Sequence, residues 1–316
     1  MHPPKDGLIE LPTMQEEKNN IRCLRCNGLS LKEKVKLPNG SYFCPYCMEL
    51  GTVKSSHKFY HKKAQLHAPL WNTLTWHGSL TKGQQMISDS VVEAIKKTEK
   101  LLVHAVTGAG KTEMIFEGIQ VALEKGLTVG IAIPRVDVCI ELYPRMKEAF
   151  STIEIGLLHG RSKEEFRDLP LIICTTHQLM RFYDYFDVLI VDEVDAFPFA
   201  YNEQLAFALK NACKKTHSLI YLTATPSQDL LKEMPLVTLP ARFHRKLLTV
   251  PEFIWCGNWR EKLLKKKLAK SFRKVIRNCI EDDFPFLIFC PVIDLLPLLK
   301  EAITQKFGTL TFETVS

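Results

Sequence analysis

A strand pattern runs into a glycine loop and then into a helix between Leu101 and Thr112, where the sequence reads LLVHAVTGAGKT. Gly108 and Gly110 have no Cβ, so the backbone N–H groups of this loop can turn inward onto an anion, and the following helix adds the positive end of its dipole. Lys111 is placed to reach the β- and γ-phosphates of a nucleotide, and the Thr112 hydroxyl is placed to bind Mg²⁺. The stretch therefore predicts a phosphate-binding loop for ATP, with contacts from Thr107, Gly108, Ala109, Gly110, Lys111 and Thr112.

The first glycine of the usual phosphate-loop pattern, GxxxxGK[ST], is replaced here by Ala105, so the sequence reads A-x-x-G-A-G-K-T. In this respect the stretch resembles motif I of superfamily 2 helicases and translocases, in which Ala is common at that position. A chance glycine-rich turn is the alternative. The preceding strand pattern, the Lys-Thr pair and the helical pattern from Met114 to Leu123 argue against it.

Apolar runs alternate with amphipathic helical patterns after the loop, which indicates a parallel sheet with helices on both faces. We expect strands at Leu127–Pro134, Ile153–Leu158, Pro170–Thr175, Val188–Val191 and Ser218–Thr223, and helices at Val136–Phe150 and Asn202–Ala212. The fold class is therefore α/β, and residues 79–240 are expected to form a RecA-like ATPase domain. Ligands of such sheets gather at the carboxyl ends of the strands.

One acidic motif and one motif with two hydroxyl side chains follow predicted strands of this sheet. The sequence DVLIV leads into DEVD, where Asp192 can hold the Mg²⁺ shell through water and Glu193 can polarise the water that attacks the γ-phosphate. The sequence SLIYL ends in TATP at Thr223–Pro226. With the phosphate loop, these motifs have the order and the strand-end positions of motifs I, II and III of a superfamily 2 motor. We expect Glu193, Lys111 and Asp192 to be the catalytic residues.

A glutamine precedes the phosphate loop at the start of a predicted helix, in the sequence LTKGQQ. Leu80-Thr81-x-x-Gln84 resembles the upstream glutamine motif of superfamily 2 enzymes, whose side-chain amide pairs with N6 and N7 of adenine. Gln85 is adjacent and also fits the motif. We assign the adenine contact to Gln84.

Three further loops follow predicted strands, at Pro134–Arg135, His159–Arg161 and Thr175–His177. They resemble the motifs Ia to Ib with which related motors contact the sugar-phosphate backbone. Hydroxyl, amide and arginine donors of this kind hold a strand without reading its sequence. Arg135 and Arg161 fit equally well as ordinary surface arginines.

Two cysteine pairs, Cys23/Cys26 and Cys44/Cys47, are separated by seventeen residues. Two C-x2-C pairs at this separation offer four thiolates to one tetrahedral ion, and the turn sequence Pro38–Gly40 fits a β-hairpin between them. We expect a zinc module over residues 21–52. A rubredoxin-like iron site and a redox dithiol are the alternatives, and zinc is favoured because nothing else in the chain indicates electron transfer. The other six cysteines lie in apolar segments and are expected to be reduced core residues.

The segments on either side of the cysteine module carry weaker signals. Residues 1–20 are polar and have no hydrophobic period, so we expect a mobile tail. Residues 53–78 are expected to be a linker that packs on the next domain. A second metal site and a base-stacking surface are alternatives for this segment, because it contains aromatic residues and four histidines, His57, His61, His67 and His77.

The net charge of +7 is concentrated in one stretch, since Ala241–Ile280 carries twelve Lys or Arg residues against two acidic residues. Such a stretch favours a phosphate backbone as partner, although a solvated helix face explains the charge equally well. A basic amphipathic helix is expected there, with one apolar face made of Leu264, Leu268, Phe272, Ile276 and Cys279. Asp283–Val292 resembles motif IV, the first strand of a second RecA-like domain. Residues 241–316 are therefore expected to be a basic connector and the incomplete start of a second lobe.

The chain has 316 residues, of which 46% are hydrophobic, so it is long enough for more than one packed core. It contains no apolar run of ~18 residues, and its N-terminal sequence has no hydrophobic segment of a secretory signal. We expect a cytoplasmic protein without membrane insertion. Peripheral association with the membrane stays open.

The four-cysteine module occurs together with LTWHGSLTKGQQ, VTGAGKTEM, VDEVDAFPF, LTATPS and LPARFHR over essentially the whole chain. This combination resembles the ComFA family. The resemblance implies an ATPase, stimulated by single-stranded DNA, that helps to import transforming DNA in competent bacteria, with ATP, Mg²⁺ and Zn²⁺ as cofactors and ComFC and DprA as partners. Two alternatives are a PriA-like replication-restart helicase and a non-motor, zinc-dependent DNA-binding assembly module with a residual ATP site.

A G-R-x-G-R type arginine motif, which brings charge to the γ-phosphate from the second lobe of such motors, is not found in the sequence. We therefore interpret the chain as an N-terminal portion of a longer protein. An arginine finger is worth roughly 10³–10⁵ in rate in related phosphoryl transfer. The chain alone is accordingly expected to bind ATP and single-stranded DNA weakly and to hydrolyse ATP slowly.

Overall fold

The computed structural model describes residues 8–62, 66–161, 167–195, 202–244, 250–283 and 285–308. These residues belong to two compact units, residues 1–246 and 247–316. The first seven residues of the predicted tail, the end of VDEVDAFPF after Asp195, and Phe284 of the predicted motif IV strand lie outside the described residues.

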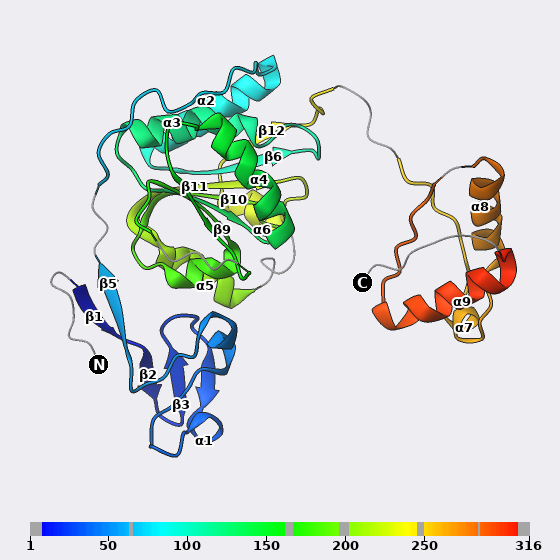
Figure 1. The fold of residues 1–316 in the computed structure, drawn as a ribbon, viewed down its shortest axis with the longest axis horizontal. Coiled ribbons are helices and arrows are strands. Elements are labelled where there is room, and N and C mark those ends of the chain that lie inside the picture. The colour runs from blue at the N-terminus through cyan, green and yellow to red at the C-terminus, as the bar shows by residue number, and fades with distance from the viewer. Residues whose placement is uncertain are drawn as a thin grey trace. The chain divides into compact units, whose positions relative to one another are not determined.

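A parallel sheet forms the centre of the first unit (Figure 1). Its strands are β6 (Lys100–Ala105), β7 (Val129–Ile133), β8 (Ile155–Leu158), β9 (Leu171–Thr175), β10 (Phe186–Asp192), β11 (Cys213–Thr223) and β12 (Leu236–Leu239). The order across the seven-stranded sheet is β12-β6-β11-β10-β7-β9-β8, and neighbouring strands are parallel. All carboxyl ends therefore lie along one edge of the sheet.

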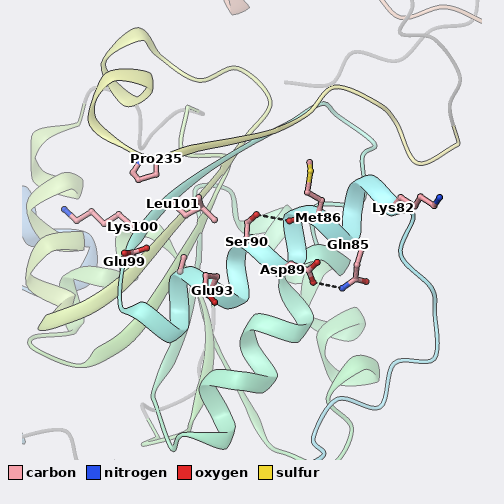
Figure 2. A pocket seen from close by; sticks show the side chains of 11 residues that line it. Lys82, Gln85, Met86, Asp89, Ser90, Glu93, Glu99, Lys100, Leu101 and Pro235 are labelled. Atoms are coloured by element: carbon pink, nitrogen blue, oxygen red, sulfur yellow. Dashed lines mark hydrogen bonds between the residues drawn. The ribbon is translucent and has the colours of Figure 1, made fainter.

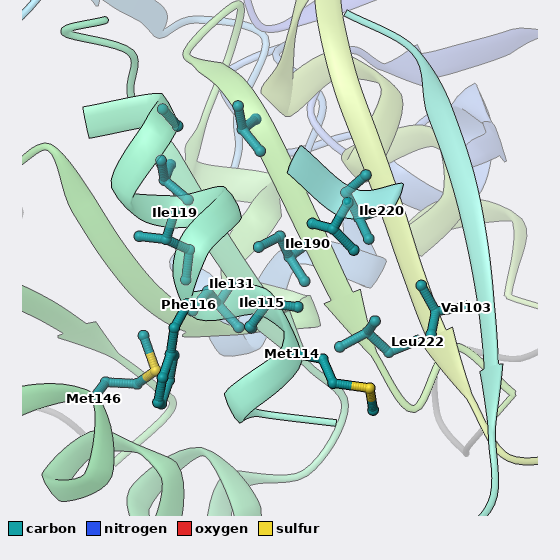
Figure 3. Close-up of a cluster of buried hydrophobic side chains, with 14 of the residues drawn as sticks. Val103, Met114, Ile115, Phe116, Ile119, Ile131, Met146, Ile190, Ile220 and Leu222 are labelled. Atoms are coloured by element: carbon teal, nitrogen blue, oxygen red, sulfur yellow. The ribbon is translucent and has the colours of Figure 1, made fainter. Parts of the chain in front are cut away.

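Helices cover both faces of this sheet. One face carries α2 (Lys82–Lys97), α3 (Phe116–Glu124) and α4 (Val136–Ala149), and Figure 3 shows Phe116 and Ile119 of α3 beside Ile131 and Ile190 of the strands. The other face packs against α5 (Glu203–Ala212) and the 3₁₀ helix η3 (Thr176–Arg181). The strands are buried on both faces, which is why their sequences are continuous apolar runs instead of alternating ones.

The predicted α/β class and its parallel sheet are confirmed. Each strand expected after the phosphate loop is present, and so are both expected helices, with their ends shifted by a few residues. The edge strand β12 was not predicted from the sequence. It has only four residues and one of them is buried, so it carries no periodic signal and forms because β6 offers a hydrogen-bonding edge.

The cysteine pairs lie in a small module built of antiparallel strands. β2 (Met14–Glu17), β3 (Asn20–Cys23) and β4 (Leu29–Leu31) form one sheet, and β1 (Leu8–Pro12) pairs with β5 (Lys58–Lys62). Two short helices complete the module, α1 (Lys32–Val35) and the 3₁₀ helix η1 (Pro45–Leu50). The predicted turn at Pro38–Gly40 is present, because the Leu37 amide donates to the Ser41 carbonyl at 2.7 Å.

The prediction of a mobile tail over residues 1–20 is wrong for residues 8–20, which are largely strands. The polar sequence of β2, MQEE, shows no apolar alternation. β1 becomes ordered by pairing with β5, which is far away in the sequence. Local patterns carry no information about such a partner, and the strand was missed for that reason.

Residues 66–78 pack on the sheet domain, as predicted for the linker. The Thr73 hydroxyl donates to Gln120 Oε1 at 2.7 Å, and the His67 amide donates to the Gly126 carbonyl at 2.9 Å. Leu70, Leu74 and Trp76 lie against the core beneath α3 and α4. Lys58–Lys62, however, belongs to the cysteine module as β5, and no second metal site is found among the described histidines.

The second unit is a small helical cluster with α7 (Trp259–Leu264), α8 (Lys270–Glu281), a 3₁₀ turn η4 (Ile293–Leu295) and α9 (Leu296–Phe307). The single basic helix predicted from Leu264 to Cys279 is wrong, because the chain breaks between α7 and α8 at Lys266, whose φ is 53°. α8 alone keeps the predicted amphipathic face, with Ile276 buried.

The strand predicted at Asp283–Val292 is also wrong. Residues 285–292 form no strand, and the side chains of Leu287 and Phe289 are 84% and 89% exposed. A strand needs a neighbour for its backbone hydrogen bonds, and the described residues 250–283 and 285–308 contain no other strand to supply one.

No helix in the described parts of the chain is long and apolar enough to cross a membrane.

Gly130→Ala is expected to destabilise the first unit by about 1–3 kcal/mol, as over-packing of a core does. A Cβ on Gly130 of β7 would lie 2.7 Å from Cε1 of Phe186 and 2.9 Å from Cδ1 of Leu189, both of which are fully buried. Urea unfolding followed by circular dichroism measures this loss as a lower midpoint with an unchanged slope.

Gly160→Ala is the matched control, since a Cβ at Gly160 would meet no atom within 4 Å. Its effect on the free energy of unfolding is expected to stay within about 0.5 kcal/mol. Equal midpoints for the two variants would contradict the packing of β7 against Phe186.

Candidate nucleotide site and four-cysteine centre

The phosphate loop connects the buried strand β6 to the helical segment of α3. Gly108 and Gly110 have φ angles of 78° and 77°, which residues with a Cβ rarely adopt. Lys111 and Thr112 lie in a turn that leads into a 3₁₀ turn, η2 (Glu113–Ile115), and then into α3. The sequence-predicted loop residues Thr107, Gly108, Ala109, Gly110, Lys111 and Thr112 therefore lie together at the carboxyl end of β6.

Asp192, the last residue of β10, lies in the electrostatic field of Lys111. Burial raises the pKa of Asp192 from 3.8 to about 6, and the positive charge of Lys111 opposes this rise. The ammonium group itself lies 3.4 Å from the Ala105 carbonyl, across the base of the loop. The structure thus brings together the predicted cation and the predicted Mg²⁺-binding carboxylate, although they are far apart in the sequence.

Glu193 follows directly with a backbone conformation that is unusual for a side chain of its kind. Its φ is 52°, in the left-handed region, and its amide donates to Asp192 Oδ1 at 2.9 Å. A residue with a Cβ in this region is strained by on the order of 1–3 kcal/mol, and strain of this kind concentrates at functional sites. The turn directs the chain away from β10 immediately after the Asp192 carboxylate.

Asp195 joins the DEVD motif to the TATP motif on the neighbouring strand. The hydroxyl of Thr223, at the end of β11, donates to Asp195 Oδ1, and the hydroxyl of Thr225 donates to Oδ2. The Thr225 amide in turn donates to Thr223 Oγ1 at 3.0 Å. One carboxylate therefore links the two motifs.

Gln84 lies against the phosphate loop, whereas Gln85 does not. The Gln84 side chain is buried, its Nε2 donates to the Ala109 carbonyl at 2.9 Å, and its Oε1 accepts from the Thr81 amide at 2.9 Å. The second contact closes a capping box at the N-terminus of α2. Gln84 Oε1 also accepts from the Thr81 hydroxyl at 3.0 Å, so both of its lone pairs are used, and adenine N6 could donate to it only by displacing a Thr81 contact.

A surface hollow of about 760 Å³ lies along α2, and the phosphate loop does not line it (Figure 2). Gln85, Met86 and Glu93 of α2 line it, together with Lys100 at the start of β6 and Pro235 before β12. No residue from Ala105 to Thr112 contributes to it. Gln85 donates to Asp89 Oδ1 in this hollow, which separates it from the phosphates.

The three loops resembling motifs Ia to Ib follow β7, β8 and β9. Arg135 follows β7 and pairs with Asp137 at 2.5 Å, and the Arg161 amide donates to His159 Nδ1 at 3.2 Å after β8. Thr176 follows β9, and its buried hydroxyl has no hydrogen-bond partner. These strands are neighbours at one side of the sheet, so the three loops lie along the same edge as the phosphate loop.

The four predicted cysteines converge inside the N-terminal module. All four are buried, and their sulfur atoms lie within 4.8 Å of one another. The Cys23–Cys47 and Cys26–Cys44 sulfur distances are 3.8 and 3.6 Å. A zinc ion at about 2.3 Å from four sulfurs places them about 3.8 Å apart, so the cluster fits a tetrahedral ion.

Arg25 wraps around the 3₁₀ helix η1 that carries Cys47. Its Nε donates to Cys47 Sγ at 3.4 Å, and its Nη2 donates to the carbonyls of Cys47 and Gly51 at 2.9 and 2.6 Å. Hydrogen bonds from neighbouring thiols, that of Cys23 first, and from Arg25 hold the pKa of Cys47 below its usual range. The module therefore stabilises a thiolate at this position.

Three residues of these sites were missed by the sequence analysis: Asp195, Arg25 and Arg242. Each lies within a motif, namely DEVD, the first C-x2-C pair and LPARFHR, but the motif alone gives it no role. Arg242 Nε donates to the Thr107 carbonyl of the phosphate loop at 3.2 Å. The position of Arg25 inside C-L-R-C was a usable signal, since a cation beside a thiolate cluster lowers its repulsion.

Comparison with known proteins identifies the family. The chain is 41% identical over 304 residues to Competence protein ComFA of Bacillus subtilis, covering 92% of this chain and 65% of that protein. It is also 41% identical over 303 residues to Competence protein ComFA of Streptococcus pneumoniae, covering 94% of this chain and 69% of that protein. The chain belongs to the ComFA family.

The ComFA relatives are longer than this chain, which spans about two thirds of their length. Residues 77–228 match the family described as Type III restriction enzyme, res subunit. Replication restart protein PriA of Bacillus subtilis is 23% identical over 166 residues, covering 48% of this chain and 21% of that protein. The ComFA likeness therefore includes the cysteine module, whereas the restriction-enzyme family match begins after it, at residue 77.

Asp192→Asn is expected to stabilise the ligand-free ComFA-family chain at pH 7. Burial raises the Asp192 pKa from 3.8 to about 6, so its protonated form contributes stability that is full below pH 3.8 and is lost as pH rises through about 6. The rise corresponds to at most about 3 kcal/mol. Because the side chain keeps some contact with solvent, we expect a gain of about 1–2 kcal/mol.

Urea unfolding without Mg²⁺, at several pH values between 4 and 8, measures this gain. The variant and the wild type should be equally stable below about pH 4, diverge between pH 4 and about pH 6, and keep a constant difference at higher pH. Asp229→Asn, at an exposed position of α6 (Gln228–Glu233), is the control and should show no such divergence. A pH-independent effect of Asp192→Asn would contradict the assigned burial of the charge.

Proposed function

We propose that this chain is the nucleotide-binding part of an ATP-dependent translocase that acts on single-stranded DNA during the uptake of transforming DNA. The proposal is supported by the family and by the distribution of motifs along one edge of the sheet. On the same family basis, ComFC and DprA are the proposed partners.

The observation that carries the proposal is the division of this edge into two halves. The phosphate loop, DEVD and TATP follow β6, β10 and β11, which are neighbours in the sheet. The loops with donors suited to a sugar-phosphate backbone follow β7, β9 and β8, which are the next neighbours. ATP and a DNA strand can therefore bind side by side on one rigid sheet, which is what a motor requires if hydrolysis is to change its grip on DNA.

The residues of the nucleotide half divide the chemistry of hydrolysis among them. Lys111 places a positive charge at the β- and γ-phosphates, and Glu193 orients and deprotonates the attacking water. Mg²⁺, when bound, neutralises charge on the phosphates, and Thr112 and Asp192 are the residues that would hold it. Asp195 would link this centre to Thr223 at the end of β11 and to Thr225 in the turn after it.

The cysteine cluster is proposed to hold a structural zinc ion. A structural site has four protein ligands and no open position, as four buried thiols within 4.8 Å provide. The module is too small to be stable through its apolar core alone. Zinc would replace that core, and Arg25 would offset part of the negative charge of four thiolates.

A second candidate is the assembly module, in which DNA binding persists while ATP turnover is vestigial. The second unit favours it, because Trp255 and Phe253 are 89% and 93% exposed beside a basic helix, as in surfaces that stack on bases. The PriA-like alternative is less well supported, since that likeness covers 48% of this chain against 92–94% for the ComFA relatives.

Glu193→Gln is expected to bind ATP as the wild type does and to lower the single-stranded-DNA-stimulated turnover at least 100-fold, because it keeps the shape and removes the base. Lys111→Ala is expected to lose nucleotide binding itself, since it removes the cation at the phosphates. A fluorescent ATP analogue measures binding, and phosphate release with and without single-stranded DNA measures turnover.

Glu141→Gln, on the exposed face of α4, is the matched control and should leave both quantities unchanged. Turnover by Glu193→Gln at the wild-type rate would refute the role of Glu193 in hydrolysis. All of these measurements are made on a full-length version, because slow turnover is expected of this chain alone. Binding of nucleotide and DNA by that version without any turnover would favour the assembly module.

The purified chain is expected to contain one zinc ion, and Cys44→Ser is expected to lose it. The module should then unfold and become sensitive to protease, while the sheet domain keeps its own melting transition. Elemental analysis measures the metal, and proteolysis with peptide mapping locates the loss of structure. Chelation of the wild-type metal should reproduce the pattern.

Cys279→Ser, at a half-buried position of α8, is the control and should retain the metal. Iron in place of zinc would redirect the proposal to a rubredoxin-like centre. A chain without metal, or one with a Cys23–Cys47 disulfide, would exclude a structural metal site.

A further inference from the structure

The phosphate loop is held from outside through three consecutive carbonyl groups. Arg242 Nε donates to the Thr107 carbonyl at 3.2 Å, the Phe243 amide donates to the Gly108 carbonyl at 3.0 Å, and Gln84 Nε2 donates to the Ala109 carbonyl at 2.9 Å. The donors come from both sides of the loop in sequence. The loop therefore does not take its shape from its glycines alone.

Fixing a carbonyl also fixes the amide that follows it, because the C=O and N–H of one trans peptide point in opposite directions. The bond from Arg242 to Thr107 directs the Gly108 N–H to the opposite side of the loop. The bond from Gln84 to Ala109 does the same for the Gly110 N–H. These are the two glycines with positive φ, and a loop with its amides turned to one side is an anion-binding concavity.

Arg242 reaches the loop because of the edge strand β12. The last residue of β12, Leu239, pairs with Ala105 at the end of β6, and its carbonyl accepts from the Val106 amide at 3.3 Å. The chain after β12 therefore runs beside the loop, and the Arg242 side chain lies 3.6 Å from the position that a Cβ on Gly108 would occupy. Four residues after Arg242 the first unit ends, at Lys246.

We propose that Arg242 is a positioning residue of the nucleotide site: it holds the Thr107 carbonyl so that the Gly108 amide faces the phosphates, and it couples nucleotide occupancy to the chain that leads into the second unit. The inference rests on the proposed function, since it assumes that ATP binds at this loop. Coupling of this kind is reciprocal, so a change in the conformation of residues 242–243 would in turn change nucleotide affinity.

The burial and the contacts of Arg242 distinguish it from a residue that only supports the fold. Its side chain is half-buried, and its contact is to a loop carbonyl instead of to the core. The Phe243 contact uses a backbone amide and persists in any Arg242 variant. Substitution should therefore alter the Thr107 peptide specifically while β12 stays paired with β6.

Arg242→Gln should weaken binding of a fluorescent ATP analogue roughly tenfold, as loss of one charge-assisted hydrogen bond does. The Michaelis constant for ATP should rise by a similar factor while kcat changes less than about threefold, because the side chain does not touch the reacting atoms. Arg242→Lys should restore part of the affinity, since it keeps the charge and one donor without the planar geometry. Arg167→Gln is the control and should bind nucleotide normally. Arg167 lies shortly before β9 and pairs with Glu154.

A second measurement uses the wild-type chain. Trypsin cleaves after Arg242 and after Arg167. The rates of these two cleavages can therefore be followed in one digest, with and without a non-hydrolysable ATP analogue. Nucleotide should slow cleavage after Arg242 at least threefold and leave cleavage after Arg167 unchanged. Equal slowing at both sites, or none at Arg242, would refute the coupling.

The outcomes separate this inference from the function on which it rests. If the wild type binds no nucleotide, the proposed function fails. If the wild type binds and Arg242→Gln binds equally well, the proposed function stands and the positioning role is wrong. If Arg242→Gln loses its cooperative unfolding transition, the Arg242→Lys affinity and the wild-type digest decide. Wild-type affinity of Arg242→Lys, together with cleavage after Arg242 that nucleotide does not slow, would then overturn the proposal.

Discussion

The strands of the central sheet all run in the same direction, and the site depends on this constraint. Parallel strands place their carboxyl ends along one edge, where backbone groups are no longer used by the ladder and loops can hold polar residues. β6, β10 and β11 end there with a phosphate loop, a carboxylate pair and two hydroxyls. An antiparallel arrangement would send every second motif to the opposite edge.

The charges at this edge are only partly balanced in the ligand-free protein. Burial disfavours the Asp192 carboxylate, and Lys111 offsets only part of that penalty, so the pKa lies at about 6. Glu193 adds a left-handed backbone conformation to the same segment. Both features raise the free energy of the folded chain. Stability is given up locally because the surrounding strands are fully buried and hold the segment in place.

The connections between the motifs are as informative as the motifs. Asp195 accepts hydrogen bonds from Thr223 and Thr225, so the DEVD and TATP segments respond together. The loop carbonyls of Thr107 and Ala109 accept hydrogen bonds from Arg242 and Gln84, which are far apart in the sequence of the domain. The geometry of the loop therefore depends on a residue in the first turn of α2 and on a residue that follows β12.

The sequence alone determined the features that depend on local chemistry. Glycines before a Lys-Thr pair predict a phosphate loop, continuous apolar runs predict strands buried on both faces, and cysteines spaced as pairs predict a tetrahedral site, because each pattern is a direct consequence of backbone freedom, burial or ligand geometry. The α/β class, the strands after the loop and the convergence of the four cysteines follow from these patterns. The resemblance to a glutamine motif singled out Gln84, and the structure shows its contact with the Ala109 carbonyl of the loop.

Only the tertiary structure decided the features that depend on a partner elsewhere in the chain. Leu8–Pro12 is a strand because β5 pairs with it, and β12 is a strand because β6 has a vacant edge. Phe286–Cys290, with a stronger strand pattern than either, forms none within the described residues of the second unit, since it has no neighbour there. Arg242 acquires its contact with the phosphate loop in the same way. Hydrogen bonds of strands and loops are made between segments, so a sequence pattern shows which segments are able to form them and the fold decides which of them do.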